Sequence, residues 1–244
     1  MRIAIVSSPR SGNTWLRCVL RDAFQLQEVA VHNYLEADLL PERCVFQLHW
    51  YREPNFQDFL AKHRFRIVTL ARHPLDVLIS VLHFVRYEPA TARWLNGNCV
   101  IPSRLVGRSP ASEEFLEYAL SFGSENLLSI TYQWWHDPSA IKVRYEDFVT
   151  ATTSVADTLA DQLNALKDRL PEALSANSLE MFKALPNRHG WQGRPGLWQT
   201  LIPSDSAAAI YARHEHVFRT LGYTVEPTLL SHETAETNWT ALVR

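Results

Sequence analysis

The first twenty residues (MRIAIVSSPRSGNTWLRCVL) constrain the fold of this chain more than any other segment. Residues 3–6 form an apolar, partly β-branched run, which predicts a strand buried on both faces of a parallel sheet. A turn-rich stretch with Pro9 and Gly12 follows, and from Thr14 onward apolar residues recur at helical spacing. A strand, a loop of small residues and a helix N-terminus together form an anion-binding arrangement. The first helical N–H groups have no intrahelical partner and carry the positive end of the helix dipole.

This loop differs from the P-loop of nucleoside triphosphatases, which has two glycines and a lysine directly before Ser or Thr. Here Arg10 precedes Gly12, and Asn13 occupies the usual lysine position. Backbone N–H groups, Ser11 and Thr14 can still hold a phosphate, and Arg10 would lie beside the group being transferred. The alternative that an apolar strand and a serine-rich turn serve only the fold stays open at this point.

Length, charge and cysteine content narrow the class of protein. The 244 residues suit a single domain, 1–244, and a net charge of −2 gives the surface no general basic field for nucleic acid or an anionic membrane. The three cysteines show no metal-ligand spacing, and their odd number argues against a disulfide framework. Without a signal-peptide pattern or a long apolar window, the sequence predicts a cytoplasmic protein with no membrane span.

Strand and helix patterns alternate along the chain, which predicts an α/β fold. We expect a three-layer sandwich with a central, mostly parallel sheet flanked by helices, in a P-loop-like nucleotide-binding topology with right-handed crossovers. Besides residues 3–6, the predicted strands are 44–49, 66–71 and 141–145, and 28–34 is a short strand or a connection. The predicted helices after the first one are 54–62, 74–87, 112–121, 124–136, one within 153–168, 178–185 and 204–221. Residues 88–110 and 187–198 are predicted loops, the former on the acceptor side, and 223–244 a tail.

Ligands of such sheets bind beyond the carboxyl ends of the strands. Four features of the sequence fall at predicted strand ends: the loop 7–14, His49, Arg72 and Tyr145. In the helix that begins at Pro74, the apolar residues share one stripe, and Ser80 turns away from it toward the expected cleft. Each feature alone has a structural explanation, since a strand-end arginine is often a salt-bridge partner and a single histidine is often structural. Their coincidence favours a binding site.

Two motifs resemble those of sulfotransferases that use 3′-phosphoadenosine 5′-phosphosulfate (PAPS). Residues 8–15 (SPRSGNTW) are similar to the 5′-phosphosulfate loop of that family, and residues 68–80 (VTLARHPLDVLIS) are similar to its 3′-phosphate motif. The resemblance continues in residues 143–148 (VRYEDF) and in the loop 188–198, and it covers about residues 1–222. It implies PAPS as co-substrate, 3′-phosphoadenosine 5′-phosphate (PAP) as product, transfer to a hydroxyl or an amine, and no metal.

The resemblance also implies donor-binding roles for individual residues. Arg72 and Ser80 would grip the 3′-phosphate, while Trp15 and Tyr145 would frame the adenine. The remaining donor-binding residues would be those of the phosphosulfate loop: Arg10, Ser11, Gly12, Asn13 and Thr14. The late loop matches the family pattern in two registers that cannot both hold without an insertion. Either Arg188 or Arg194 would therefore reach the 3′-phosphate.

Sulfuryl transfer, like phosphoryl transfer, depends on positioning and charge stabilisation more than on covalent catalysis. Arg10 would stabilise charge on the leaving oxygen, although a guanidinium is a poor proton donor. The resemblance places His49 where relatives keep a catalytic histidine, so a neutral imidazole there could take the proton of an acceptor hydroxyl. His83 is an alternative base. With Ser80, these considerations give the predicted catalytic set of Arg10, His49 and Ser80.

The acceptor is only partly constrained by the sequence. Five aromatic residues are expected to line its pocket: Trp50, Tyr51, Phe84, Tyr87 and Trp94. Such rings suit a phenol or natural product as well as the apolar face of a saccharide. Arg10 and the short segment before the loop favour a bacterial-type enzyme. The sequence leaves open the oligomeric state and two other functions: an ATP-dependent small-molecule kinase and a non-catalytic nucleotide-binding module.

Overall fold

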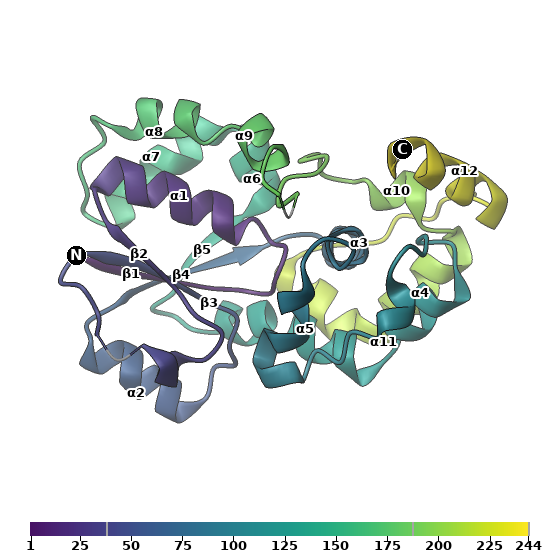
Figure 1. Ribbon diagram of the computed structural model, residues 1–244, viewed down its shortest axis with the longest axis horizontal. Coiled ribbons are helices and arrows are strands. Elements are labelled where there is room, and N and C mark those ends of the chain that lie inside the picture. The colour runs from purple at the N-terminus through teal and green to yellow at the C-terminus, as the bar shows by residue number, and fades with distance from the viewer. Residues whose placement is uncertain (38, 187, 244) are drawn as a thin grey trace.

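The computed structural model describes residues 1–37, 39–186 and 188–243, and they form one parallel sheet with helices on both faces (Figure 1). The strands are β1 (Arg2–Val6), β2 (Gln27–Ala30), β3 (Cys44–Leu48), β4 (Arg66–Ala71) and β5 (Ile141–Arg144), in the order β2-β3-β1-β4-β5. Every neighbouring pair is parallel, so all the carboxyl ends meet at one edge of the sheet. The predicted α/β class and three-layer arrangement are confirmed.

The α-helices follow the predicted order, with four additions among the described residues. The long or central ones are α1 (Asn13–Phe24), α2 (Pro54–Lys62), α3 (Pro74–Phe84), α4 (Glu113–Ala119), α5 (Phe122–Trp135), α7 (Thr152–Gln162) and α11 (Ser204–Leu221). The shorter α6 (Tyr145–Thr150) begins at the predicted end of the fourth strand, and α9 (Leu179–Lys183) matches the predicted helix at 178–185. The helices that the sequence patterns did not predict are α6, α8 (Leu170–Ala176), α10 (Trp198–Leu201) and α12 (His232–Val243). None of the helices in the described ranges is long and apolar enough to cross a membrane.

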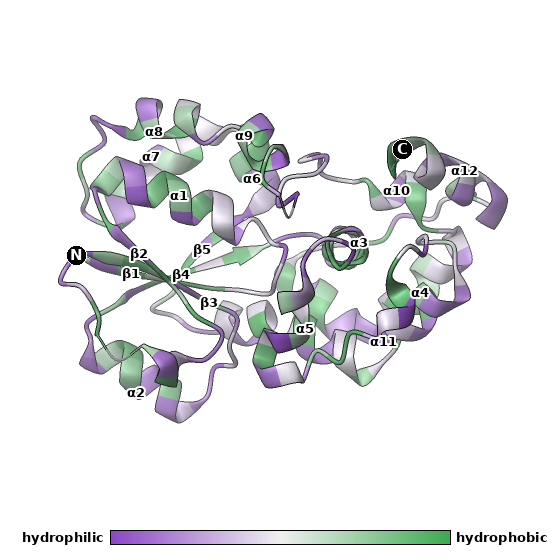
Figure 2. Ribbon diagram, in the orientation of Figure 1, coloured by the Kyte–Doolittle hydropathy of each residue, from purple (hydrophilic) through white to green (hydrophobic). Residues whose placement is uncertain are grey.

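Two apolar cores lie on opposite faces of the sheet, because side chains alternate along each strand. On β1, Ile3 and Ile5 pack with α1, α7 and α8, whereas Ala4 and Val6 belong to the larger core with α2, α3, α5 and α11. In Figure 2 the central strands β1, β3 and β4 are largely hydrophobic, as expected for strands covered on both sides, whereas the edge strand β2 is mostly polar and exposed. This double cover fixes the sheet and leaves its carboxyl edge as the place where polar side chains collect.

The C-terminal segment differs from the tail that the sequence suggested. Residues 232–243 form α12, which packs on α10 and buries Ala235 and Trp239. The Trp239 ring lies 5.5 Å from that of Trp191, edge to face. The prediction failed because α12 carries only a thin apolar stripe, so most of its stability comes from this tertiary contact. Arg244 lies outside the described residues.

Trp239 gives a direct test of this packing. Replacing it with alanine is expected to lower the free energy of unfolding by about 3–5 kcal/mol, since a buried indole is lost and a cavity remains. The matched control is Asn238→Ala, next in sequence, which loses only a surface hydrogen bond to the Thr200 carbonyl and should cost at most about 1.5 kcal/mol. Urea unfolding measures both. Equal, small effects would mean that α12 does not pack as described.

Candidate functional site

A cavity of about 710 Å³ opens at the carboxyl edge of the sheet. Its walls come from the β1–α1 loop, the ends of β3 and β4, the start of α6 and the late loop. The predicted site residues that line it are Arg10, Gly12, Asn13, Thr14, Trp15, His49, Arg72, Ser80 and Tyr145. Three others, Ser11, Arg188 and Arg194, are not part of its lining. The fold therefore brings both predicted phosphate motifs and His49 into one space.

Hydrogen bonds to β4 and α5 fix the loop between β1 and α1 in place. The Ser7 hydroxyl accepts a hydrogen bond from the Leu70 N–H at 2.7 Å, and the Ser8 N–H donates to the Thr131 hydroxyl at 2.8 Å. Gly12 has a left-handed φ of +97°, and a Cβ at this position would lie 2.8 Å from the Tyr145 ring. Only glycine meets both conditions without strain, so the turn before α1 depends on this residue.

Arg10 is fixed by three contacts at the bottom of the cavity. Its Nε donates to the Ser80 hydroxyl at 3.0 Å, and Nη2 donates to the His189 carbonyl at 2.8 Å. The guanidinium also lies 4.0 Å from the centre of the Phe84 ring. Burial, with the nearby charge of Arg72, lowers the pKa of Arg10 to about 9. The side chain thus remains a cation at neutral pH, and the cost of its burial would be relieved by an anion.

Arg72 is buried beside Arg10 at the end of β4, with 8% of its surface exposed. Its Nη1 donates to the Arg10 carbonyl at 3.0 Å, and its guanidinium covers the Tyr145 ring at 4.6 Å. Among the described residues neither guanidinium has a carboxylate within ion-pair distance. Two neighbouring buried cations without an ion pair among the described residues are costly, so this arrangement is typical of a site for an anionic ligand.

His49 follows β3 directly and points its imidazole into the cavity wall. Its Nδ1 lies 2.8 Å from the Ser7 carbonyl oxygen, which can only accept, so Nδ1 carries the proton. Burial outweighs this hydrogen bond and lowers the pKa of His49 to about 4. At neutral pH the ring is therefore neutral, and Nε2 keeps a free lone pair. This is the protonation state that a general base requires.

The alternative base, His83, lies outside the cavity lining. Its ring stacks on Trp191 with centroids 4.5 Å apart, and it is 3% exposed. Its Nδ1 has no hydrogen-bond partner among the described residues, and burial lowers its pKa to about 3. The geometry thus favours His49 over His83 as the residue that meets an acceptor.

The late loop contributes backbone and aromatic groups in place of the predicted arginines. Residues 189–193 line the cavity, whereas Arg188 and Arg194 are exposed and Arg188 lies over the Tyr87 ring. Residue 187, where the predicted loop begins, lies outside the described residues. Contact of either arginine with a 3′-phosphate remains a prediction that this arrangement does not support. The stretch between them, not the arginines, faces the cavity.

Three anchors hold the late loop to the sheet. The Arg10 guanidinium binds the His189 carbonyl, and the Tyr145 hydroxyl donates to the Gly193 carbonyl at 3.0 Å. The carboxylate of Asp76, in the first turn of α3, accepts from the N–H groups of residues 196 and 198 at 2.7 and 3.0 Å. Arg10 and Tyr145 thus line the cavity and also hold the late loop by hydrogen bonds. Substituting either residue would therefore disturb the position of that loop.

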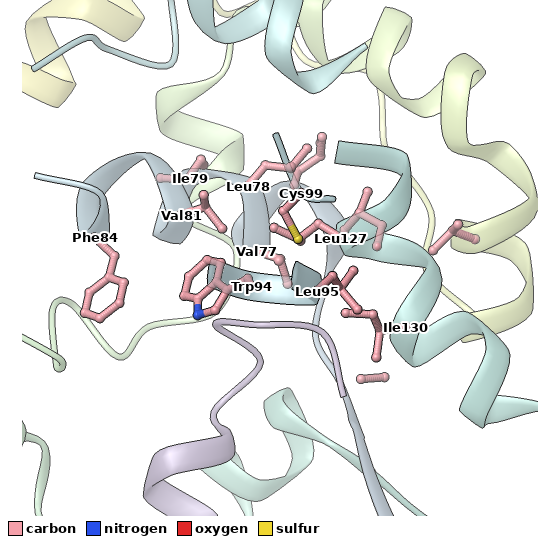
Figure 3. Close-up of a cluster of buried hydrophobic side chains, with 14 of the residues drawn as sticks. Val77, Leu78, Ile79, Val81, Phe84, Trp94, Leu95, Cys99, Leu127 and Ile130 are labelled. Carbon is pink, nitrogen blue, oxygen red and sulfur yellow. The ribbon is translucent and has the colours of Figure 1, made fainter. Parts of the chain in front are cut away.

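Several cavity residues were absent from the predicted set. They are Arg17 and Gln47, His32 after β2, His189, and a group from α8 and α9 that includes Leu174, Asn177 and Phe182. Arg17 carried a usable signal, since it lies one helical turn beyond Asn13. His189 and the α8–α9 residues carried none, because their position depends on long-range packing. Of the five aromatic residues expected around the acceptor, Phe84 and Trp94 line this cavity and appear together in Figure 3; Trp50, Tyr51 and Tyr87 lie elsewhere.

Comparison with known proteins identifies this architecture at the level of fold. No protein-family model and no curated protein matches the sequence. Solved structures do match. Mouse sulfotransferase SULT7A1 complexed with PAP superposes with a TM-score of 0.67 at 16% identity, covering 89% of this chain and 84% of that one. The chain has a sulfotransferase fold. Retinol dehydratase in complex with androsterone and inactive cofactor PAP matches with a TM-score of 0.63 at 15% identity, covering 92% and 82%.

Within this sulfotransferase fold, the cavity fits a nucleotide that carries phosphates. The Ser11 hydroxyl and the Arg72 Nε are buried donors without a hydrogen-bond partner in the described part of the chain. The first turn of α1, residues 13–15, carries N–H groups that lie at the positive end of the helix dipole, and no side chain of the cap residue, Gly12, bonds to them. Trp15 and Tyr145, with ring centroids 6.4 Å apart, add an aromatic frame. The donor set matches the chemistry of phosphate oxygens.

A metal site requires side chains that are grouped so that they could bind a metal ion. Within residues 1–37, 39–186 and 188–243, no group of three or more His, Cys, Asp and Glu side chains is placed to hold a metal ion. The expectation of metal-free transfer remains a prediction that requires a measurement of activity.

The buried histidines of the site predict a loss of stability in mild acid. The pKa values of His49, His83 and His189 all lie below 6.5, chiefly because of burial, so the unfolded chain binds their protons first as the pH falls. The free energy of unfolding should drop between pH 6.5 and 4.5 by at least about 1.4 kcal/mol per pH unit. His232, whose pKa is raised by Asp205, acts weakly in the opposite direction. Urea unfolding at several pH values measures the slope, and a flat profile would contradict this protonation scheme.

Proposed function

We propose that this protein is a sulfotransferase that moves the sulfuryl group of PAPS to an acceptor hydroxyl. An amine acceptor, giving a sulfamate, fits the same chemistry. One observation carries the proposal: Arg10, Arg72 and Ser80, drawn from both motifs, meet His49 in a single cavity at the carboxyl edge of the sheet. The sulfotransferase fold supports it, and so do the structural neighbours, both of which are complexes with PAP.

The donor half of the proposal assigns each phosphate to a part of the cavity. The α1 N-terminus, Ser11 and Thr14 would hold the 5′-phosphosulfate, and Arg72 with Ser80 would hold the 3′-phosphate. When bound, PAPS supplies an activated sulfuryl group. The contacts of Arg10 with Ser80 and Arg72 link the two phosphate positions. A nucleotide with phosphates at both ends of its ribose would therefore engage both motifs at once.

The chemical step needs one base and one cation from this chain. His49 Nε2 takes the proton from the acceptor hydroxyl as the acceptor oxygen bonds to sulfur and the bond between sulfur and the phosphate oxygen breaks. Arg10 stabilises the negative charge that grows on that leaving oxygen. A fixed cation in a buried site is effective because it needs no reorganisation during the step. Ser80 orients Arg10 through the 3.0 Å hydrogen bond to Nε.

The acceptor side would lie near Trp94, whose ring is 5.9 Å from that of His49 and parallel to Phe84. Residues 88, 90 and 94 of the loop 88–110 belong to the cavity lining, in line with the predicted acceptor-side role of that loop. An aromatic wall of this kind supports a phenolic or natural-product hydroxyl or a saccharide as the acceptor class.

The experiment that tests the proposal is transfer of labelled sulfate from PAPS to a panel of phenols and sugars. It is run with EDTA present, followed by detection of PAP and of the sulfated product. Sulfated product formed without divalent metal is the expected result. Phosphorylated product formed from Mg·ATP instead would favour the kinase, and PAP binding without any transfer would favour a non-catalytic module.

A further inference from the structure

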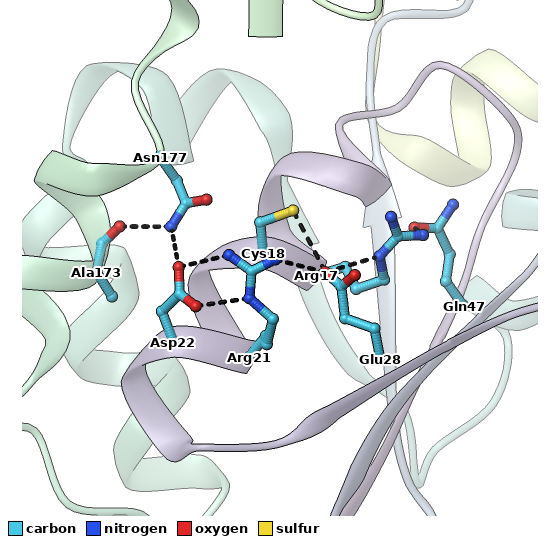
Figure 4. Close-up of polar contacts among 8 residues, drawn as sticks. All are labelled: Arg17, Cys18, Arg21, Asp22, Glu28, Gln47, Ala173 and Asn177. Carbon is cyan, nitrogen blue, oxygen red and sulfur yellow. Dashed lines mark hydrogen bonds and ion pairs between the residues drawn. The ribbon is translucent and has the colours of Figure 1, made fainter. Parts of the chain in front are cut away.

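Arg17 lines the cavity from α1, beyond the end of the proposed phosphate loop. It lies on α1 one turn beyond Asn13, and its side chain is 16% exposed. Its Nη1 donates to the Gln47 Oε1 at 2.9 Å (Figure 4). Gln47 is the penultimate residue of β3, His49 follows the end of that strand, and both side chains line the same cavity as Arg17. The Arg17 guanidinium is thus held beside the proposed base.

The carboxylates that balance Arg17 lie behind it, away from the cavity. Glu28 contacts the Arg17 Nε at 3.4 Å but is closer to Arg21, at 3.1 Å. Asp22 pairs with Arg21 through both of its oxygens, at 2.6 and 2.7 Å. Neither Glu28 nor Asp22 belongs to the cavity lining. The two arginines and two carboxylates drawn in Figure 4 balance in charge, and of these four residues Arg17 alone lines the cavity.

The proposed donor assignment leaves one arginine of the cavity wall without a role. Three arginines line it, and Glu88 is the single carboxylate among the lining residues that the structure describes. The proposed donor site uses Arg10 and Arg72, which touch each other on the β4 side. Arg17 faces the other side, where β2 and β3 end. Its like charge also adds to burial in lowering the pKa of His49, which indicates that the two are close.

We propose that Arg17 binds an anionic group of the acceptor, so that the acceptors are hydroxyl-bearing acids with a carboxylate, sulfate or phosphate beside the reacting hydroxyl. This inference rests on the proposed function. A guanidinium fork pairs with such groups through two parallel N–H donors. A neutral acceptor would cover Arg17 and leave its remaining N–H groups without partners, which is unfavourable. Arg17 therefore selects acceptors by charge, while His49 acts on their hydroxyl.

The test compares Arg17→Gln with a matched variant, Arg21→Gln. Arg21 is one helical turn further on, shares Glu28 and lies outside the cavity lining. The probes are paired acids and amides: 3- and 4-hydroxybenzoate, glucuronate and their amides. With PAPS saturating, wild type and Arg21→Gln should show a kcat/KM at least about tenfold higher for one acid than for its amide, a ratio typical of one charge-assisted contact. Arg17→Gln should lose that preference through a higher KM for the acid, while its Kd for PAP stays unchanged.

Two outcomes would overturn the inference. One is a wild-type protein for which every amide is as good a substrate, or binds as well in the presence of PAP, as its acid. The same holds for a wild-type protein that neither uses nor binds any of the acids. The other is an Arg17→Gln variant that keeps the preference or loses PAP binding, since the latter would make Arg17 a donor ligand. Binding of PAP by the wild type, measured first by calorimetry, separates this failure from failure of the proposed function. Absence of PAP binding would defeat the function itself.

Discussion

Replacing His49 with glutamine is expected to lower kcat by about 10²–10⁴-fold, the usual contribution of a general base. Glutamine keeps a polar side chain near the Ser7 carbonyl but has no basic nitrogen. The Kd for PAP should change little, because His49 lies outside the phosphate loop and the Arg72 motif. Rapid-quench measurement of sulfuryl transfer with both substrates saturating reports the chemical step.

Two further variants define what the His49 result means. His216 is exposed on α11, in contact with the Tyr132 ring, and His216→Gln should leave kcat unchanged. In the alternative scheme His83 is the base, so turnover lost in His83→Gln and retained in His49→Gln would transfer the role to His83.

The acid limb of the pH profile of kcat/KM is a second readout of the role of His49. It should begin well below pH 6, since the pKa of His49 is lowered to about 4.

Arg72→Met is expected to weaken PAP binding by about 10²–10³-fold, as is typical when one partner of a buried charge pair is truncated. The effect on the stability of the free protein should be small. The variant loses the hydrogen bond to the Arg10 carbonyl, but it also relieves the burial of a second guanidinium beside Arg10. A large loss of ligand affinity with little loss of stability is the signature of a residue retained for binding.

The control for Arg72→Met is Arg66→Met. Arg66 begins β4, whose other end carries Arg72, and it binds the Gln162 carbonyl on the surface. Its substitution should leave the Kd for PAP unchanged. Titration calorimetry of both variants, with urea unfolding in parallel, separates binding from folding. A Kd within about threefold of wild type for Arg72→Met, less than 0.7 kcal/mol, would remove Arg72 from the donor site.

The sequence predicted most of this site because its residues sit next to strand ends. Arg10, His49, Arg72 and Tyr145 each follow an apolar run, and a parallel sheet brings such positions to one edge whatever the loops do. The orientation of Ser80 toward the cavity could be predicted from helical periodicity alone. These predictions used local patterns and one topological rule, and the cavity contains all five residues.

The sequence was less informative where position depends on distant packing. Arg188 and Arg194 were assigned by motif, and their contact with a 3′-phosphate stays a prediction; the late loop that carries them is held by Asp76, Tyr145 and Arg10, which lie far away in sequence. The helix α12 was missed for the same reason, because the contact of Trp239 with Trp191 has no local signature. Arg17 was overlooked although its place on α1 was predictable. Its partner Gln47 lies thirty residues away on β3.

The central claim is that one cavity binds a nucleotide phosphorylated at both the 5′ and the 3′ position. Calorimetric titration of the wild-type protein with PAP and with 5′-AMP, in EDTA, tests it most directly. We expect one PAP to bind per chain, about 10²-fold or more tighter than 5′-AMP, because only PAP can pair its 3′-phosphate with Arg72 and Ser80. Equal affinities for the two nucleotides, or tight binding of Mg·ATP with none of PAP, would contradict the account.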